Sequence, residues 1–176
     1  MKLIHSYLFF AYFFCYSENA ADVQVQINGS ILSQSCNVKS TDLTKNVIFN
    51  DLNLGEFPYT GSVSEPEEVN IRLENCTGNV EQIYYIFSGE QDLNAPNLLK
   101  ITGQSGSSYD DLAKGIAIEI LDENKKAVPL NEKINLNKAI TEKTYDFKFF
   151  LRYKSTSPTV TSGDASSLLY LDFYYE

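Results

Sequence analysis

The side chains that most often carry out chemistry in proteins are scarce in this chain of 176 residues. It has one histidine, His5, and three cysteines, Cys15, Cys36 and Cys76. A His-based triad, a proton shuttle or a His-ligated zinc site needs an imidazole. His5 lies in a leader that we expect to be removed, so we predict no enzyme, no metal site and no cofactor.

Carboxylates are the remaining candidates for acid–base chemistry or calcium binding. They gather at residues 65–68 and at Asp110–Asp111. Neither group has the alternating ligand spacing of a calcium loop, so we expect solvated loops. An enzyme that uses carboxylates alone is the most distant alternative.

The first 20 residues have the pattern of a secretory signal peptide. Lys2 precedes a short apolar run at residues 8–14, and small or polar residues follow up to Ala20. The run is too short to cross a bilayer, which takes roughly 18 residues or more. Cleavage after Ser17 fits the small-residue rule better than cleavage after Ala20, and both sites stay open.

Export determines how the cysteines are interpreted. Cys15 leaves with the leader, and Cys36 and Cys76 remain as an even pair in an exported chain, which favours a disulfide over a metal site or a reactive thiol. Closing a loop of about 40 residues contributes roughly 3–4 kcal/mol. The formal net charge of −9 argues against a nucleic-acid partner.

The dominant hydrophobic pattern has a period of two, which predicts short strands with one apolar face. Turn-forming residues separate these segments at the spacing of an all-β sandwich, and the length suits one domain. Residues 89–114 contain Pro96, Gly103 and Gly106, and we expect a long surface loop with a helical turn at Tyr109–Lys114. The predicted strands are residues 23–31, 69–73, 83–87, 116–120, 134–136, 145–153 and 169–175.

Both ends of the mature chain carry such a strand. The first has Val23, Val25, Ile27 and Ile31 on one face with Gly29 between them, and no clear turn folds it back on the chain. Near the other end, alternating apolar residues continue almost to the last position. These residues are Leu169, Leu171, Phe173 and Tyr175.

These features together resemble the fimbrial subunits of the chaperone–usher family. Gly163 is fourteenth from the end and Tyr175 is penultimate, as in that family. The start Ala21-Asp22-Val23 is most similar to type 1 pilus minor or tip-adaptor subunits, which favours cleavage after Ala20. Cys36, sixteenth from Ala21, also matches the family's half-cystines.

The resemblance implies an incomplete immunoglobulin-like β-sandwich that lacks its last strand. Residues 1–20 would be the signal peptide, 21–33 an N-terminal donor-strand extension and 34–176 the pilin domain. The groove beside the terminal strand would first hold a strand of a periplasmic chaperone and then the arm of another subunit. The strand recognised by chaperone and usher would comprise Gly163, Leu169, Leu171, Phe173 and Tyr175.

The implied function is a structural subunit that polymerises by donor-strand exchange and supports cell adhesion. Its partners would be the periplasmic chaperone, the outer-membrane usher and neighbouring pilins or a tip adhesin, and its destination the surface fimbrium. A major shaft subunit and a self-sufficient secreted binding protein are the alternatives. Residues 22–32 could also be an ordinary first strand paired within its own sheet.

Overall fold

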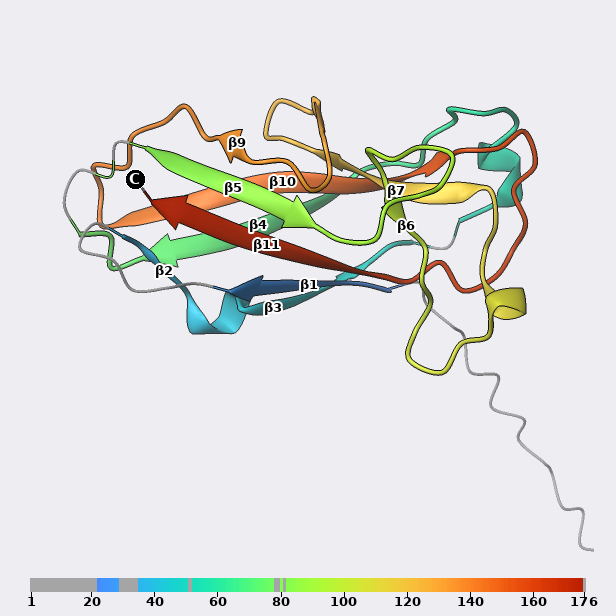
Figure 1. Ribbon diagram of the computed structural model, residues 1–176, viewed down its shortest axis with the longest axis horizontal. Coiled ribbons are helices and arrows are strands. Elements are labelled where there is room, and N and C mark those ends of the chain that lie inside the picture. Colours follow the sequence, from blue (N-terminus) through green and yellow to red (C-terminus); the bar gives the residue numbers. More distant parts are fainter. Residues whose placement is uncertain (1–21, 29–34, 51, 78–79, 81, 176) are drawn as a thin grey trace, which may run out of the picture.

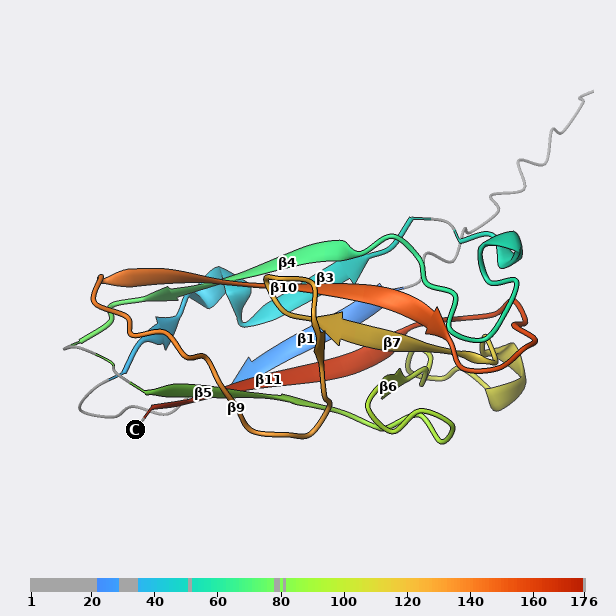
Figure 2. The same ribbon diagram turned by 90° about the horizontal axis from the view of Figure 1, so that it is seen from above.

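The computed structural model describes residues 22–28, 35–50, 52–77, 80 and 82–175. Two β-sheets pack face to face, so the predicted all-β sandwich is confirmed (Figures 1 and 2). The first sheet has the order β3 (Thr44–Ile48), β1 (Asp22–Asn28), β11 (Ser167–Tyr175), β5 (Ile83–Ser88), β9 (Ile134–Asn135). The second has the order β2 (Asn37–Val38), β4 (Glu67–Glu74), β10 (Thr144–Ser155), β7 (Ile116–Leu121), β6 (Leu99–Lys100), and β8 (Ala127–Val128) pairs with β7.

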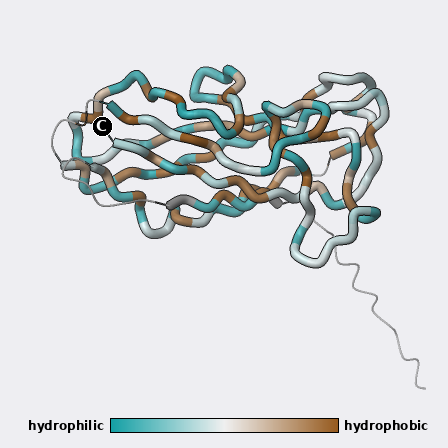
Figure 3. Tube along the Cα trace, in the orientation of Figure 1, coloured by the Kyte–Doolittle hydropathy of each residue, from teal (hydrophilic) through white to brown (hydrophobic). Residues whose placement is uncertain are grey.

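Period-two alternation explains the long strands. In β10, Phe147, Phe149 and Leu151 are buried between the sheets, whereas the intervening residues face outward. Figure 3 shows the alternation of hydropathy along the strands. Aromatic rings fill the middle of the core, and the ring centroids of Phe147 and Phe173 lie 5.1 Å apart. Edge-to-face contacts of this kind add to the hydrophobic stabilisation.

The predicted disulfide between Cys36 and Cys76 is present. Cys36 directly precedes β2, and Cys76 follows β4, with which β2 pairs. The bridge therefore links the segment just before β2 to the end of β4, at one end of the second sheet.

The prediction that residues 89–114 form only a surface loop is wrong. Leu98, Leu99 and Ile101 are buried, and the short strand β6 pairs with β7. The hydroxyl of Ser167 donates a hydrogen bond to the carbonyl of Lys100 over 2.6 Å, which ties β6 to the first sheet. The predicted helical turn is a single 3-10 turn, η3 (Tyr109–Asp111).

Two more 3-10 turns, η1 (Ser40–Asp42) and η2 (Leu54–Glu56), flank β3. In the described part of the chain, no helix is long and apolar enough to span a membrane. The predicted signal peptide lies outside the described residues.

Candidate assembly groove

The N-terminal strand is an internal strand of the first sheet and does not project from the domain. β1 runs parallel to β11 and antiparallel to β3, so it fills the space between them, which we call the assembly groove (Figure 1). Val25 pairs with Leu169 on one side and with Lys45 on the other. This is the pairing within its own sheet that the sequence left open as an alternative to donation.

The floor of the groove is apolar. Val23 and Val25 are fully buried, whereas Gln24 and Gln26 are exposed on the outer face. Burying the two valines stabilises the fold by about 3–6 kcal/mol gross. Without β1, the facing edges of β3 and β11 would lose these contacts and their backbone partners, which exposed strand edges tolerate poorly.

The described residues cover only part of the predicted arm. Ile27 belongs to β1 by its backbone pairing with Leu171, and nothing is described of its side chain. Gly29 and Ile31 lie outside the described residues. Their proposed role in a neighbour's groove therefore stays a prediction.

The wall formed by β11 has the predicted phase. Leu169, Leu171 and Phe173 are buried against the opposite sheet. Tyr175 is mostly buried, and its hydroxyl donates a hydrogen bond to the carbonyl oxygen of Cys36 over 3.1 Å. Burial raises the pKa of Tyr175 to about 12, so its hydroxyl stays protonated at neutral pH.

Gly163 stands at a close approach of two backbone segments just before β11. A Cβ atom at this position would lie 2.4 Å from the backbone nitrogen of Ala113 and 2.6 Å from the carbonyl oxygen of Asp111. Real Cβ atoms do not approach backbone so closely, so only glycine fits. The structure thus gives Gly163 a packing role, and recognition by chaperone or usher stays a prediction.

The groove extends past the first residue of β1. Asp22 pairs with Ile48, the last residue of β3, and Val23 pairs with Ser167, the first of β11. Beyond these pairs, a cavity of about 310 Å³ with both apolar and polar lining residues opens between the segments that flank the two strands. Its walls include Phe49, Leu52, Leu54, Phe57, Ile116 and Ala165.

Sequence reasoning missed the β3 side of the groove. Val47, which pairs with Val23, and Phe49 are both buried. Their spacing of two residues was the available signal, but the run from Thr44 to Ile48 is short and starts with polar residues.

Comparisons with known proteins agree with this architecture. A fimbrial-like protein of Escherichia coli K12, YcbU, is 34% identical over 88% of this chain and 84% of its own length. The type-1 fimbrial protein subunit of Serratia marcescens is 29% identical, over 84% of this chain and 83% of its own. The crystal structure of the P pilus rod subunit PapA has a TM-score of 0.64 at 18% identity, over 80% of this chain and 99% of that one.

The same fold in PapA supports the pilin variant of the immunoglobulin-like sandwich. The fimbrial protein family model matches residues 25–176, which include every strand described here except the start of β1. The chain therefore belongs to the fimbrial protein family, whose members are structural proteins rather than enzymes.

Proposed function

We propose that the chain is a chaperone–usher fimbrial subunit that polymerises by donor-strand exchange, with β1 as the exchangeable strand. The observation that carries this proposal is the position of β1 between β3 and β11. Backbone pairing with both neighbours holds it there, and of its described side chains only Val23 and Val25 are buried. A strand from another subunit with the same apolar spacing would make equivalent contacts.

The cavity beyond β1 gives an incoming strand an advantage. A donor that also places an apolar side chain among Phe49, Phe57 and Ala165 would bury surface that β1 leaves open. Each such side chain adds about 1.5–3 kcal/mol. Displacement of β1 would then be favourable, and the released β1 would serve as the arm for the next subunit.

Within the family, we propose a minor or tip-adaptor role, with assembly at the cell surface after export and transfer from a periplasmic chaperone to the usher. The support is the start Ala21-Asp22-Val23, which resembles adaptor subunits. A shaft subunit would differ in one respect. Its arm would fit the groove of another copy of the same subunit well enough to make long homopolymers.

The test uses the domain without its arm, residues 34–176, expressed with a pilus chaperone and then mixed with a peptide of residues 21–33. We expect the peptide to displace the chaperone and to give a stable complex in size-exclusion chromatography. The same peptide with Gly29→Leu should fail, because a leucine would clash where the groove closes.

A peptide with Gln24→Ala and Gln26→Ala is the matched control, because both positions face solvent in β1. If residues 34–176 prove compact and stable alone, the exchange mechanism is wrong. If the intact subunit forms long polymers by itself, the adaptor role is wrong and the shaft role is right.

A further inference from the structure

One charged residue lies on the outer face of the two strands that wall the assembly groove. It is Asp172 of β11, between Tyr170 and Tyr174 on the face that points away from the core. Across the groove, the outward residues of β3 are all uncharged: Thr44, Asn46 and Ile48. Asp172 pairs through the backbone with Asn28 of β1, so it lies directly beside the strand that fills the groove.

The carboxylate of Asp172 has no counter-charge in the described part of the chain. The residue is half-buried, and it makes no hydrogen bond or ion pair with any described residue. Burial raises its pKa, and no neighbouring charge offsets the shift. Lys133 lies over the rings of Tyr84 and Tyr174 instead. The cost of partly burying this carboxylate is therefore uncompensated while β1 occupies the groove.

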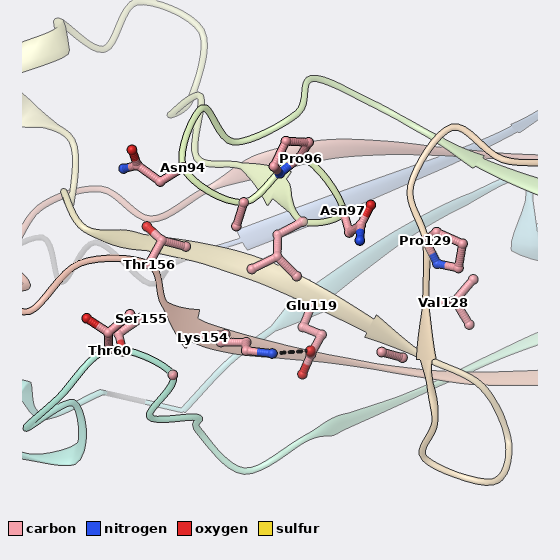
Figure 4. A pocket seen from close by; sticks show the side chains of 14 residues that line it. Thr60, Asn94, Pro96, Asn97, Glu119, Val128, Pro129, Lys154, Ser155 and Thr156 are labelled. Carbon is pink, nitrogen blue, oxygen red and sulfur yellow. Dashed lines mark hydrogen bonds and ion pairs between the residues drawn. The ribbon is translucent and has the colours of Figure 1, made fainter.

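The two most deeply buried carboxylates among the described residues show the usual arrangement. Glu119 of β7 is 4% exposed, and it binds Lys154 Nζ over 2.6 Å (Figure 4) and Arg152 Nε over 2.7 Å. Asp42 is also buried, and it binds Lys45 Nζ over 2.8 Å. Each of these charges is paired within the sandwich, so a cation for Asp172 would have to come from the strand beside it.

The chain's own arm does not supply that cation. Residues 21–33 contain no lysine or arginine, and their one charged residue is Asp22. The outward side chains of β1 that the structure describes, Gln24 and Gln26, are neutral. β1 therefore matches the apolar floor of the groove but not the charge on its outer face.

We propose that Asp172 is a specificity residue of the assembly groove, and that the donor arm it selects carries a lysine or arginine on its outer face. This inference rests on the proposed strand exchange and names the chemistry of the partner. Opposite charges that face each other on neighbouring strands attract, and like charges repel. Because the arm of this chain lacks a cation, the preferred donor is a different subunit.

The first test places the cation in the arm of the intact chain, residues 21–176. Asn28→Lys introduces a lysine at the position that pairs with Asp172. We expect this change to lower the unfolding constant in urea about two- to fivefold more with Asp172 present than with Asp172→Asn. Gln24→Lys is the matched control, because it pairs with Leu168 and lies about 13 Å along the strand from position 28. It should show no such coupling.

The second test measures which arm the groove accepts. The intact chain is mixed with a large excess of labelled peptides of residues 21–33 that carry Gln24→Lys, Gln26→Lys or Asn28→Lys. Three positions are needed because an incoming strand can run in either direction. We expect one of these peptides to be taken up about two- to fivefold better than the unsubstituted peptide, and glutamate at the same position to reduce uptake. Asp172→Asn should remove both effects.

The outcomes separate this proposal from the assembly function. Absence of coupling between positions 28 and 172, equal uptake of all peptides, or a lysine preference that persists in Asp172→Asn would overturn the specificity role alone. Failure of every peptide to enter the groove would refute strand exchange, and the specificity role with it.

Discussion

The hydroxyl of Tyr175 donates a hydrogen bond to the carbonyl oxygen of Cys36, 3.1 Å away and 139 positions earlier in the chain. Tyr175 ends β11, and Cys36 forms the disulfide that holds the start of the described domain to the end of β4. One contact thus joins the terminal strand of the first sheet to the covalently fixed corner of the second.

Removal of that hydroxyl should destabilise the domain. We expect Tyr175→Phe to lower the free energy of unfolding by about 1 kcal/mol, the usual net value of one hydrogen bond, and more if the Cys36 carbonyl is left dry. Urea unfolding at neutral pH measures the change. The neighbouring Tyr174, exposed on the outer face, supplies the control Tyr174→Phe, and an equal loss there would contradict this role.

Alkaline pH should weaken the fold through two tyrosines. Burial raises the pKa of Tyr175 to about 12, and burial, with Asp122 nearby, raises the pKa of Tyr85 to about 12. Because both values lie above the ordinary 10.0, the stabilisation is full below pH 10 and is lost as pH rises toward 12. We expect a loss of about 2 kcal/mol for each, and the double variant Tyr85→Phe/Tyr175→Phe should show a flatter pH dependence in thermal melts.

A covalent lock on β1 should stop strand exchange. Gln24 and Asn46 face each other across the β1–β3 pair and are both exposed. The variant Gln24→Cys/Asn46→Cys should form a cross-strand disulfide that keeps β1 in place and blocks its replacement by an excess of labelled peptide of residues 21–33, and mild reduction should restore the replacement. Either single cysteine variant is the control, and peptide uptake by the locked, oxidised protein would show that β1 is not the exchanged strand.

Loss of the Glu119 charge should be costly. Burial opposes ionisation of this carboxyl, but the hydrogen bonds from Lys154 and Arg152 outweigh it, so the pKa of Glu119 lies below its ordinary value. Its contribution is therefore present above that ordinary pKa and is lost as pH falls through the lowered one. Glu119→Gln should cost about 1–3 kcal/mol in urea unfolding, because it weakens the hydrogen bonds from two cations that are themselves partly exposed. Glu65→Gln, at an exposed position, should cost almost nothing.

Any side chain at residue 163 should strain the start of β11. We expect Gly163→Ala to destabilise the domain by about 1–3 kcal/mol, because its Cβ would push against the backbone of residues 111–113. Gly55→Ala is the control, since a Cβ there would meet only the side chain of Asn53, whose oxygen lies 3.3 Å away. A Gly163→Ala variant as stable as the wild type would refute the packing role.

Sequence periodicity predicted the strands whose two faces meet different environments. In β4, β10 and β11, one face meets the core and the other meets water, so apolar residues alternate with mostly polar ones, and in β5 buried and half-exposed residues alternate in the same way. β7 differs because all six of its residues are buried, including Glu119. Its alternation located the strand, but no local pattern shows that Arg152 and Lys154 cover the carboxylate.

The short strands and the burial of loop residues were not predicted, because they leave no periodic pattern in the sequence. β6 and β8 have two residues each, too few to show a period, and their burial comes from partners far along the chain. The proline and glycines of residues 89–114 indicated irregular backbone, yet Leu99 is fully buried. The sequences of the two end strands predicted the groove. Its β3 side and the cavity beyond β1 could be identified only from the tertiary structure.

The parallel seating of β1 turns assembly into a competition governed by concentration. An arm tethered to its own groove acts at an effective concentration in the millimolar range, as short flexible links do. A dilute neighbour of equal affinity would almost never win, so free subunits should persist as closed monomers. Growth would then be confined to places where donors are delivered one at a time at high local density, which keeps filaments from forming before they reach their destination.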